Sequence, residues 1–320
     1  RLLFAKLKCM QSSEIVIVGS TNMDMVVNTD RIPVPGETIL AKEFFMNPGG
    51  KGANQAVAVA RLGGNTIFVT KIGNDVFGHQ SVQLFDDEGI DTRHILSDSE
   101  LPSGVALITV DKIGENSIVV AAGANGNLHS KDLNDNILND ISKAKILLMQ
   151  LEIPIETVSH LAKFASSKGV KVVLNPAPMA DVSEDLLKCL YVITPNSTEA
   201  EMLSGIKISD LESAKKAAKI IANKGVDNII LTLGSKGALV YEAGKIDFVT
   251  AEKVHAIDTT AAGDVVNGAF VVSLAQGKGL LEATKFASKA AAISVTRIGA
   301  QSSIPFRNEL IIDDLPPAQA

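Results

Sequence analysis

Short apolar runs alternate with amphipathic segments along most of this chain. The apolar runs are rich in β-branched residues and predict buried strands at 14–19, 66–71, 146–150, 171–174, 191–194 and 228–233. The amphipathic segments predict helices at 49–64, 77–88, 155–167, 181–188, 198–203 and 211–223, then a short β pair through 238–249 and two closing helices. Because strands that alternate with helices form right-handed crossovers, the pattern predicts an α/β fold with a mostly parallel central sheet and helices on both faces.

Two stretches interrupt the alternation and predict a small β-sheet appendage. Residues 25–47 hold prolines and a glycine between short alternating runs, which is typical of antiparallel strands joined by turns. Residues from about 103 to 121 contain two β-rich runs around the turn DKIGEN and predict a hairpin. We therefore expect one α/β domain over residues 13–312 that carries both insertions, with residues 1–12 and 313–320 as tails.

Polar clusters follow several predicted strands at the point where each strand ends. STNMD follows the first strand, Glu152 follows ILLMQ, NPAP follows VVL, and TPNSTE and TLGSKG follow two later strands. Ligands of parallel α/β sheets bind beyond the carboxyl ends of the strands. We therefore expect a ligand site along this edge of the sheet.

The segment Asp258–Phe270, DTTAAGDVVNGAF, predicts a helix start that faces an anion. Three small residues open it: Ala261, Ala262 and Gly263. They leave backbone N–H groups and the positive end of the helix dipole facing outward. Asp264 in the first turn would then accept a proton beside a phosphoryl group, and the dipole is expected to keep it ionised at neutral pH. In the alternative, Thr259 or Thr260 is an ordinary N-cap and Asp264 only complements the dipole.

Two glycine motifs have both a structural and a functional interpretation. In GGKGAN, the glycines either permit a tight helix entry or bring the backbone against a small ligand, with Lys51 and Asn54 as polar contacts. TLGSKG is either a strand-to-turn connection or a backbone nest for phosphate and the floor of a nucleotide site. GGKGAN lacks both the GK[ST] ending of a phosphate loop and the G-x-G-x-x-G spacing of a dinucleotide site.

The motif NSTE also allows two interpretations. Asn196 and Glu199 fit a capping box, and Thr198 with Glu201 offers a second frame for one. The functional alternative is that one of these side chains helps to organise Mg²⁺ through water, since Mg²⁺ keeps several waters and few protein ligands.

Composition and charge argue against several classes of function. The 320 residues carry a formal net charge of −6 without a basic stripe interleaved with aromatic residues, so no nucleic-acid partner is expected. No apolar run is long enough to span a bilayer, so no membrane partner is expected. Two cysteines, Cys9 and Cys189, favour a reducing compartment and a cytoplasmic location, with the nucleus as an alternative. The five histidines lack metal-ligand spacing and are expected on the surface or in loops.

The two glycine-containing motifs resemble those of a known family. GGKGANQA is similar to the first signature of the PfkB carbohydrate kinases, and DTTAAGDVVNGAF is similar to the second. The Lys-Gly-Ala-Asn form, NPAP and RIGAQSSIP resemble the ribokinase group of that family, and the match covers about Glu14–Phe306. The resemblance implies transfer of phosphate from ATP to the 5-hydroxyl of D-ribose, giving D-ribose 5-phosphate and ADP. It also implies Mg²⁺ with ATP, K⁺ as an activator, and a β-sheet lid, made of the two insertions, that pairs in a homodimer.

The resemblance assigns roles by position. Asp264 matches the catalytic base, and the anion hole matches Ala261, Ala262 and Gly263. The residues implied to hold the sugar are Asn22, Asp24, Gly50, Lys51, Gly52, Asn54, Glu152 and Asp264. Those implied to line the nucleotide site are Asn196, Thr232, Gly234, Ser235, Lys236, Gly237, Gly263 and Ser288. Glu199 is implied to support Mg²⁺ through water, and the loops of a monovalent-cation site match Asp258, Thr260, Ser294, Arg297, Gly299 and Ser303.

Other functions stay open as alternatives. The substrate could be another pentose such as 2-deoxyribose, or a nucleoside, and a non-catalytic sugar-binding regulator could use the same fold. A dinucleotide-dependent dehydrogenase is disfavoured because EIVIVGSTNMD lacks a G-x-G-x-x-G motif. The chain departs from the family pattern at Ala262, where Gly is common, at Val265 and Val266, which replace a polar-aromatic pair, and at Ser288, where a polar or ring-bearing adenine neighbour is often seen.

Overall fold

The computed structural model describes residues 14–310, so the expected tails and domain boundaries lie outside the described residues. Its main sheet has nine strands in the order β13-β12-β11-β10-β9-β8-β1-β4-β5. The bounds are β1 Ile15–Val18, β4 Thr66–Gly73, β5 Asp91–Asp98, β8 Ile146–Met149, β9 Lys171–Leu174, β10 Val192–Ile193, β11 Asn228–Thr232, β12 Gly237–Glu242 and β13 Lys245–Thr250. Pairing is parallel from β5 to β11 and antiparallel from β11 to β13. The predicted mostly parallel sheet is confirmed.

Helices cover both faces of this sheet, as predicted. One face packs on α4 (Asp135–Lys143), α5 (Ile155–Ser167), α6 (Glu184–Leu187), α7 (Ser197–Ser204) and α8 (Leu211–Asn223). The other face packs on α2 (Lys51–Arg61), α3 (Val76–Asp87), α9 (Ala262–Ala275) and α10 (Leu280–Ser294). In β1, Val16 and Val18 enter the first core while Ile15 and Ile17 enter the second. Successive side chains of a strand point to opposite faces, which explains why the strands of this sheet are continuous apolar runs.

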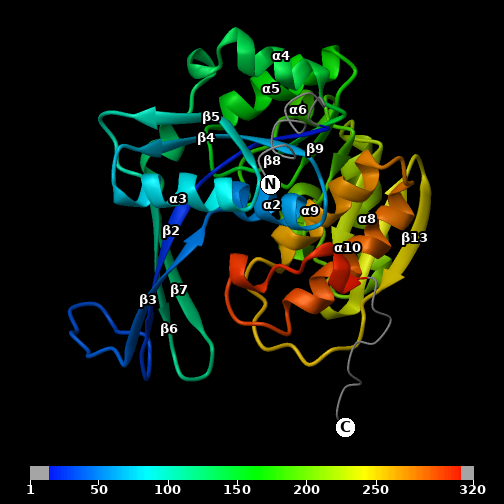
Figure 1. Ribbon diagram of the computed structural model, residues 1–320. Coiled ribbons are helices and arrows are strands. Elements are labelled where there is room, and N and C mark those ends of the chain that lie inside the picture. The colour runs from blue at the N-terminus through cyan, green and yellow to red at the C-terminus, as the bar shows by residue number, and fades with distance from the viewer. Residues whose placement is uncertain (1–13, 311–320) are drawn as a thin grey trace.

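A second, four-stranded sheet projects from the main body (Figure 1). Its order is β3-β2-β6-β7, with β2 at Asn22–Asn28, β3 at Glu43–Gly49, β6 at Gly104–Val110 and β7 at Asn116–Ala121. The β2–β3 and β6–β7 pairs are antiparallel, and the two insertions join through the parallel pair β2–β6. The predicted small β-sheet is confirmed, although β2 begins three residues before the insertion expected from the sequence.

The topology positions a ligand site beside β1. The neighbours of β1 in the sheet are β4 on one side and β8 on the other, so the chain leaves β1 in one direction and returns on the opposite side. Such a reversal opens a crevice at the carboxyl ends of the strands. Helix α2 begins in this crevice, and the short 3₁₀ helix η2 (Gly123–Asn127) follows β7 into it.

Some elements are not predicted by the sequence pattern. Strand β5 is rich in polar residues, which conceal its alternation, and α4 was not identified although Ile137 and Ile141 lie at helical spacing on its buried face. The expectation that all histidines lie on the surface or in loops is wrong for His94, which is 7% exposed in β5 and has Nε2 2.8 Å from Asp140. Within residues 14–310, no helix combines the length and apolar character needed to cross a membrane.

Candidate active site

Helix α9 starts without a capping side chain, and its N-cap Ala261 has left-handed backbone angles (φ 59°, ψ 9°). The N–H groups of Gly263 and Asp264 have no acceptor among the described residues. The Ala262 N–H is already engaged, because it donates to the Thr259 carbonyl at 3.2 Å. A Cβ at Gly263 would meet no atom within 4 Å, so the space beside this turn is open. The threonine N-cap interpretation is therefore wrong, and this helix start can receive an anion.

The Asp264 carboxylate lies in the first turn of α9 and is 6% exposed. Both its oxygens accept amide hydrogen bonds at 2.9 Å, Oδ2 from Nδ2 of Asn54 and Oδ1 from Nε2 of Gln55. Burial raises the pKa of Asp264 above its ordinary value, against the opposing effects of Lys51 and the two amides. The helix dipole favours the ionised form of Asp264, as expected from the sequence, whereas burial disfavours it. The sequence pattern did not reveal that this carboxylate is buried. A raised pKa makes the carboxylate a stronger proton acceptor.

A chain of buried amides continues behind Asp264. Gln55 Nε2 also donates to Oδ1 of Asn175 at 3.1 Å, and Gln55 Oε1 accepts from Nε2 of Gln150 at 2.5 Å. Asn267 Nδ2 donates to a carbonyl of the first turn of α9 at 2.8 Å. These amides are absent from the predicted site. The signal that could have found them is an amide side chain within or directly beside an apolar segment, as in ANQAVAVA, ILLMQ and VVNGAF, since a buried amide needs partners.

A cavity of about 380 Å³ lies between the small sheet and the carboxyl end of β8. Asn22 and Glu152, both predicted to hold the sugar, line it together with Val120 of β7. Glu152 Oε2 accepts the Lys51 N–H at 3.0 Å and also accepts the Ser20 hydroxyl. The cavity thus combines apolar walls with a few fixed polar groups, which is typical of small-molecule sites.

Lys51 is the cation of this site. Burial lowers its pKa, but four carboxylates outweigh burial and raise it: those of Asp264, Glu152, Glu199 and Asp24. Burial, together with Glu152 and Asp264, raises the pKa of Asp24 to about 6, while Lys51 opposes the shift. The fold therefore brings the charged residues of the predicted sugar site into one coupled cluster, and such shifted carboxylates are typical of functional sites.

The glycines before α2 permit close packing of backbones. Gly50, the N-cap of α2, has φ 89°, and a Cβ there would lie 2.8 Å from the backbone N of Asn22. A Cβ at Gly52 would lie 2.5 Å from the backbone N of Ser20. Both clashes are with the protein itself, so the tight-entry interpretation explains these glycines. The entry brings Lys51 against the carboxyl end of β1, and contact of the two glycines with a sugar stays a prediction.

Asn196 and Glu199 form a capping box at the start of α7. Glu199 Oε2 accepts the Asn196 N–H at 2.8 Å, and Asn196 Oδ1 accepts the Glu199 N–H at 2.9 Å. The second possible frame is not formed, because Oε1 of Glu201 accepts the Ile208 N–H at 2.7 Å. Asn196 also forms an isolated bridge with Thr232, so two of the predicted nucleotide residues meet at the ends of β10 and β11.

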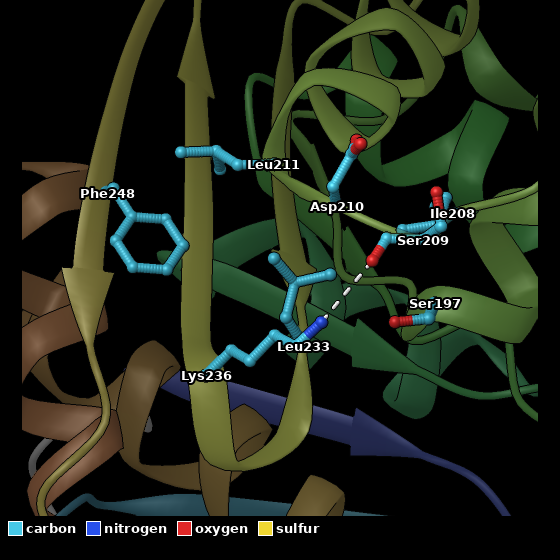
Figure 2. Close-up of a pocket in the computed structure, with 8 residues that line it drawn as sticks. All are labelled: Ser197, Ile208, Ser209, Asp210, Leu211, Leu233, Lys236 and Phe248. Carbon is cyan, nitrogen blue, oxygen red and sulfur yellow. Dashed lines mark hydrogen bonds between the residues drawn. The ribbon is translucent and has the colours of Figure 1, made fainter.

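The TLGSKG turn between β11 and β12 lies beside a cavity of about 100 Å³. It carries the predicted nucleotide residues Thr232, Gly234, Ser235, Lys236 and Gly237. Figure 2 shows Lys236 reaching toward the loop before α8, where its Nζ lies 3.4 Å from the Ser209 carbonyl. Ser288 lies in α10, which packs on β12 and β13, and it has no hydrogen bond to these residues in the described chain.

Residues 12–307 match the model of the pfkB family carbohydrate kinases. The chain belongs to this family. It is 46% identical over 297 residues to a ribokinase of Haemophilus influenzae, covering 93% of this chain and 97% of the relative. It is 38% identical over 295 residues to a deoxyribokinase of Salmonella typhi, covering 91% and 95%. The structure of Arabidopsis thaliana ribokinase complexed with ribose and ATP matches with a TM-score of 0.89 at 33% identity, covering 94% of this chain and 98% of that one.

In this pfkB family member, the two loops predicted to bind a monovalent cation lie side by side. Asp258 Oδ2 accepts the Gly299 N–H at 2.8 Å, and Asp258 Oδ1 accepts the N–H and hydroxyl of Thr260 at 2.9 and 2.6 Å. The second loop continues the chain after α10. It begins after Ser294, the last residue of α10, whose carbonyl accepts the Arg297 N–H at 3.0 Å, and it includes Ser303, whose hydroxyl donates to the Ala300 carbonyl at 2.8 Å.

The described residues do not supply a complete cage for a divalent cation. Within residues 14–310, no group of three or more His, Cys, Asp and Glu side chains is placed to hold a metal ion. Both oxygens of Glu199 already accept hydrogen bonds from Asn196, at 2.8 and 2.9 Å. Direct coordination of a metal ion by Glu199 would have to displace one of these hydrogen bonds, and its expected role through water stays a prediction.

Proposed function

We propose that the protein transfers the γ-phosphate of ATP to the 5-hydroxyl of D-ribose, giving D-ribose 5-phosphate and ADP. The observation that carries this proposal is a buried carboxylate of raised pKa, Asp264, in the first turn of an uncapped helix start. That juxtaposition places a proton acceptor beside an anion site. The ribokinase relative and the ribokinase structure complexed with ribose and ATP support these two substrates.

The reaction needs one proton transfer and one phosphoryl transfer. Asp264 accepts the proton of the sugar 5-hydroxyl as the new bond from O5 to the γ-phosphorus forms. The bond from the γ-phosphorus to the bridging oxygen breaks, and ADP leaves with that electron pair. The loose phosphoryl transition state needs positioning and charge stabilisation more than covalent help. The N–H groups of Gly263 and Asp264, which have no acceptor among the described residues, can stabilise charge on the transferred group.

The cavity beside β8 is the proposed sugar site. Glu152 is held by the Lys51 N–H, and its carboxylate can accept sugar hydroxyls. Asn22 presents its amide from the first residue of β2, and half-buried Asp24 follows two residues later. Because the small sheet carries these residues, its position over the cavity controls both sugar contacts and exclusion of water.

The turn TLGSKG and the start of α7 form the proposed nucleotide site. Lys236 supplies a cation, and Gly234 (φ 58°) gives a turn whose backbone N–H groups can face phosphate. Mg²⁺, when bound with ATP, supplies neutralisation of phosphate charge. Glu199 and Asn196 would orient its waters. K⁺ is the proposed activator at the loops around Asp258 and Gly299.

The small sheet is the proposed homodimer interface. Apolar side chains are exposed on both of its faces: Phe44, Met46, Leu107 and Val119 share one face, and Phe45, Ile118 and Val120 share the other. A sheet face of this kind is costly to leave in water and favours pairing with a second copy. Charge substitution at Ile118, followed by light scattering, tests this assembly, and an unchanged molar mass would contradict it. A cytoplasmic location, or a nuclear one, stays a prediction.

A coupled ADP-release assay across pentoses, hexoses and nucleosides tests the proposed function. We expect the highest kcat/KM with D-ribose and identify the product by its 5-phosphate in ³¹P NMR. A preference for 2-deoxyribose, the substrate class in the name of one relative, or for a nucleoside would replace the sugar in the proposal. Sugar binding without any sugar-dependent ADP release would instead favour a non-catalytic regulator.

A further inference from the structure

We infer that Gln55 is a positioning residue that holds the Asp264 carboxylate for proton transfer. Its side chain is fully buried, and its Nε2 donates one hydrogen to Oδ1 of Asp264 at 2.9 Å and the other to Oδ1 of Asn175 at 3.1 Å. It is too deeply buried to contact substrate. The inference deepens the proposed function and rests on it, because it concerns the residue that the proposal names as the base.

The hydrogen-bond partners allow only one orientation of the Gln55 amide. Its nitrogen faces two acceptors, so its oxygen must face a donor, and Nε2 of Gln150 provides that donor at 2.5 Å. Rotation of the Gln55 amide by half a turn would place its oxygen against Asp264 and two NH₂ groups against each other. Gln150 is itself fully buried, and a Cβ at Gly19 would come within 2.1 Å of its Oε1. The end of β1 therefore packs against the amide that orients Gln55.

Asn54 and Gln55 contact the same carboxylate but differ in what else they can do. Asn54 donates to Oδ2 of Asp264, while its own Oδ1 is buried without a partner among the described residues. That oxygen is available to a sugar hydroxyl, in line with the predicted role of Asn54. The Gln55 amide uses its oxygen and both its hydrogens on protein groups. Asn54 can therefore bind both Asp264 and a sugar hydroxyl, whereas Gln55 can bind Asp264 but has no group left for the sugar.

Both amides donate to Asp264, so both favour its ionised form. A proton on either carboxylate oxygen must occupy the lone pair that faces away from these donors, and this directs proton transfer. The other charged groups that act on Asp264 come from four elements or their ends. They are Lys51 at the start of α2, Glu152 after β8, Asp24 in β2 and Glu199 in α7.

The pH dependence of kcat with D-ribose tests the role of Gln55. In Gln55→Leu we expect the acidic limb of the pH profile of kcat to move up by roughly one pH unit, so that kcat falls by up to about tenfold at pH values on that limb, because the lost donor favoured the ionised base. KM for ribose should stay within about twofold, since Gln55 does not face the sugar cavity. Val59→Ala is the matched control: Val59 is fully buried on the same helix, and its side chain cannot bond the amides. Val59→Ala should lower the melting temperature without moving the acidic limb of the pH profile of kcat.

A second variant and a second measurement distinguish the loss of the positioning role from simple misfolding. Gln150→Leu leaves both Gln55 and Asp264 in place but removes the donor that orients Gln55, so it should move the limb in the same direction by less. Carboxyl ¹³C NMR, with Asp264 assigned through Asp264→Asn, should show the same upward shift in Gln55→Leu without substrate. If ribose is not phosphorylated but this shift occurs, the proposed function fails and the positioning role stands. An unmoved NMR midpoint in both folded variants would overturn the inference.

Discussion

Asn125 fixes the side chain of Asn22, because its Nδ2 donates to Oδ1 of Asn22 at 2.8 Å. Asn125 also accepts the Thr21 N–H at 2.8 Å and donates to the Thr21 carbonyl at 2.9 Å, so its own amide cannot turn over. The oxygen of Asn22 is thereby occupied by the protein, and its NH₂ group is the end left for a sugar oxygen. Asn125 lies in η2, after the second insertion, whereas Asn22 is the first residue of β2, ahead of the loop of the first insertion. The orienting residue and the residue that it orients therefore lie far apart in the sequence.

Replacement of Asn125 should weaken sugar binding more than catalysis. In Asn125→Ala we expect KM for ribose to rise about tenfold with kcat within about threefold, since an unoriented amide loses sugar binding and not chemistry. Asn127→Ala is the control, because Asn127 lies in the same η2 segment but bonds Asp98 instead. Steady-state kinetics measure both variants. A fall in kcat with an unchanged KM in Asn125→Ala would contradict the proposed orienting role.

Asp264→Asn should separate the proposed base from the anion site. The variant keeps the size of the side chain and removes the proton acceptor, so we expect kcat to fall roughly 10²- to 10⁴-fold while the fold persists. Binding of ribose and ATP, measured by calorimetry, should change far less than kcat. Near-normal turnover in the folded variant would show that another group accepts the proton.

Asp24 should couple stability to pH. Its pKa of about 6 lies above the ordinary value of an aspartate, so ionisation in the folded state destabilises the protein. This group stabilises the fold most below about pH 4 and loses that contribution as pH rises through 6. The loss is worth up to about 3 kcal/mol. Asp24→Asn should therefore gain free energy of unfolding, relative to the unmodified chain, between pH 4 and pH 8.

Denaturant unfolding at the two pH values measures this gain, and ribose titration of the same samples measures its functional cost. We expect weaker ribose binding in Asp24→Asn at pH 8, because the amide replaces a carboxylate acceptor. An equal stability difference at both pH values would argue against a raised pKa for Asp24.

Alanine at Gly263 and at Gly52 should have opposite effects on stability. A Cβ at Gly263 meets no atom and lies within helix α9, so Gly263→Ala should retain or raise the melting temperature. It should nevertheless lower kcat/KM for ATP at least tenfold, because the methyl group enters the proposed phosphate space. Gly52→Ala should destabilise the fold by several kcal/mol, since its Cβ would lie 2.5 Å from a backbone N. Full ATP kinetics in Gly263→Ala would contradict the proposed anion site.

K⁺ should raise kcat through the paired loops at Asp258 and Gly299. The Asp258 carboxylate bonds the Gly299 N–H at 2.8 Å and lies six residues before the proposed base, so an ordered loop pair would fix the start of α9. We expect several-fold higher rates in K⁺ than in a buffer of a bulky organic cation at equal ionic strength. Asp258→Asn should reduce the difference. Equal rates in the two buffers would argue against cation activation.

Much of the architecture could be predicted from local sequence. The runs IVIV and ILLM are apolar at every position, as expected of strands buried on both faces, and they form β1 and β8. Strand β5, DTRHILSD, was not predicted because it lies at the edge of the sheet and is only partly buried. Its many polar residues obscure the alternation of apolar and polar positions that marks a strand. Its buried His94 owes its place to Asp140 on α4, a contact that spacing along the chain cannot reveal.

The candidate site was predictable where its residues are neighbours in sequence. GGKGAN and DTTAAGD each carry their own turn and helix start, so backbone chemistry and resemblance sufficed to identify them. The amides Gln55 and Gln150 were not found, because each looks like an isolated polar residue near an apolar segment, and Asn175 was noted only as part of NPAP, without a role. They acquire a role only when α2, β8 and β9 pack beside α9 and their amides must find partners.

The start of α9 shows the same division most clearly. The sequence by itself determined that small residues precede Asp264 and that a helix follows, because these depend on side-chain size and periodicity. Only the tertiary structure decided that no threonine caps the helix and that Ala261 turns left-handed. It also decided that burial and two amides from α2 act in opposite directions on the Asp264 pKa. Burial and long-range hydrogen bonds depend on distances between elements that lie far apart in sequence, and packing alone sets those distances.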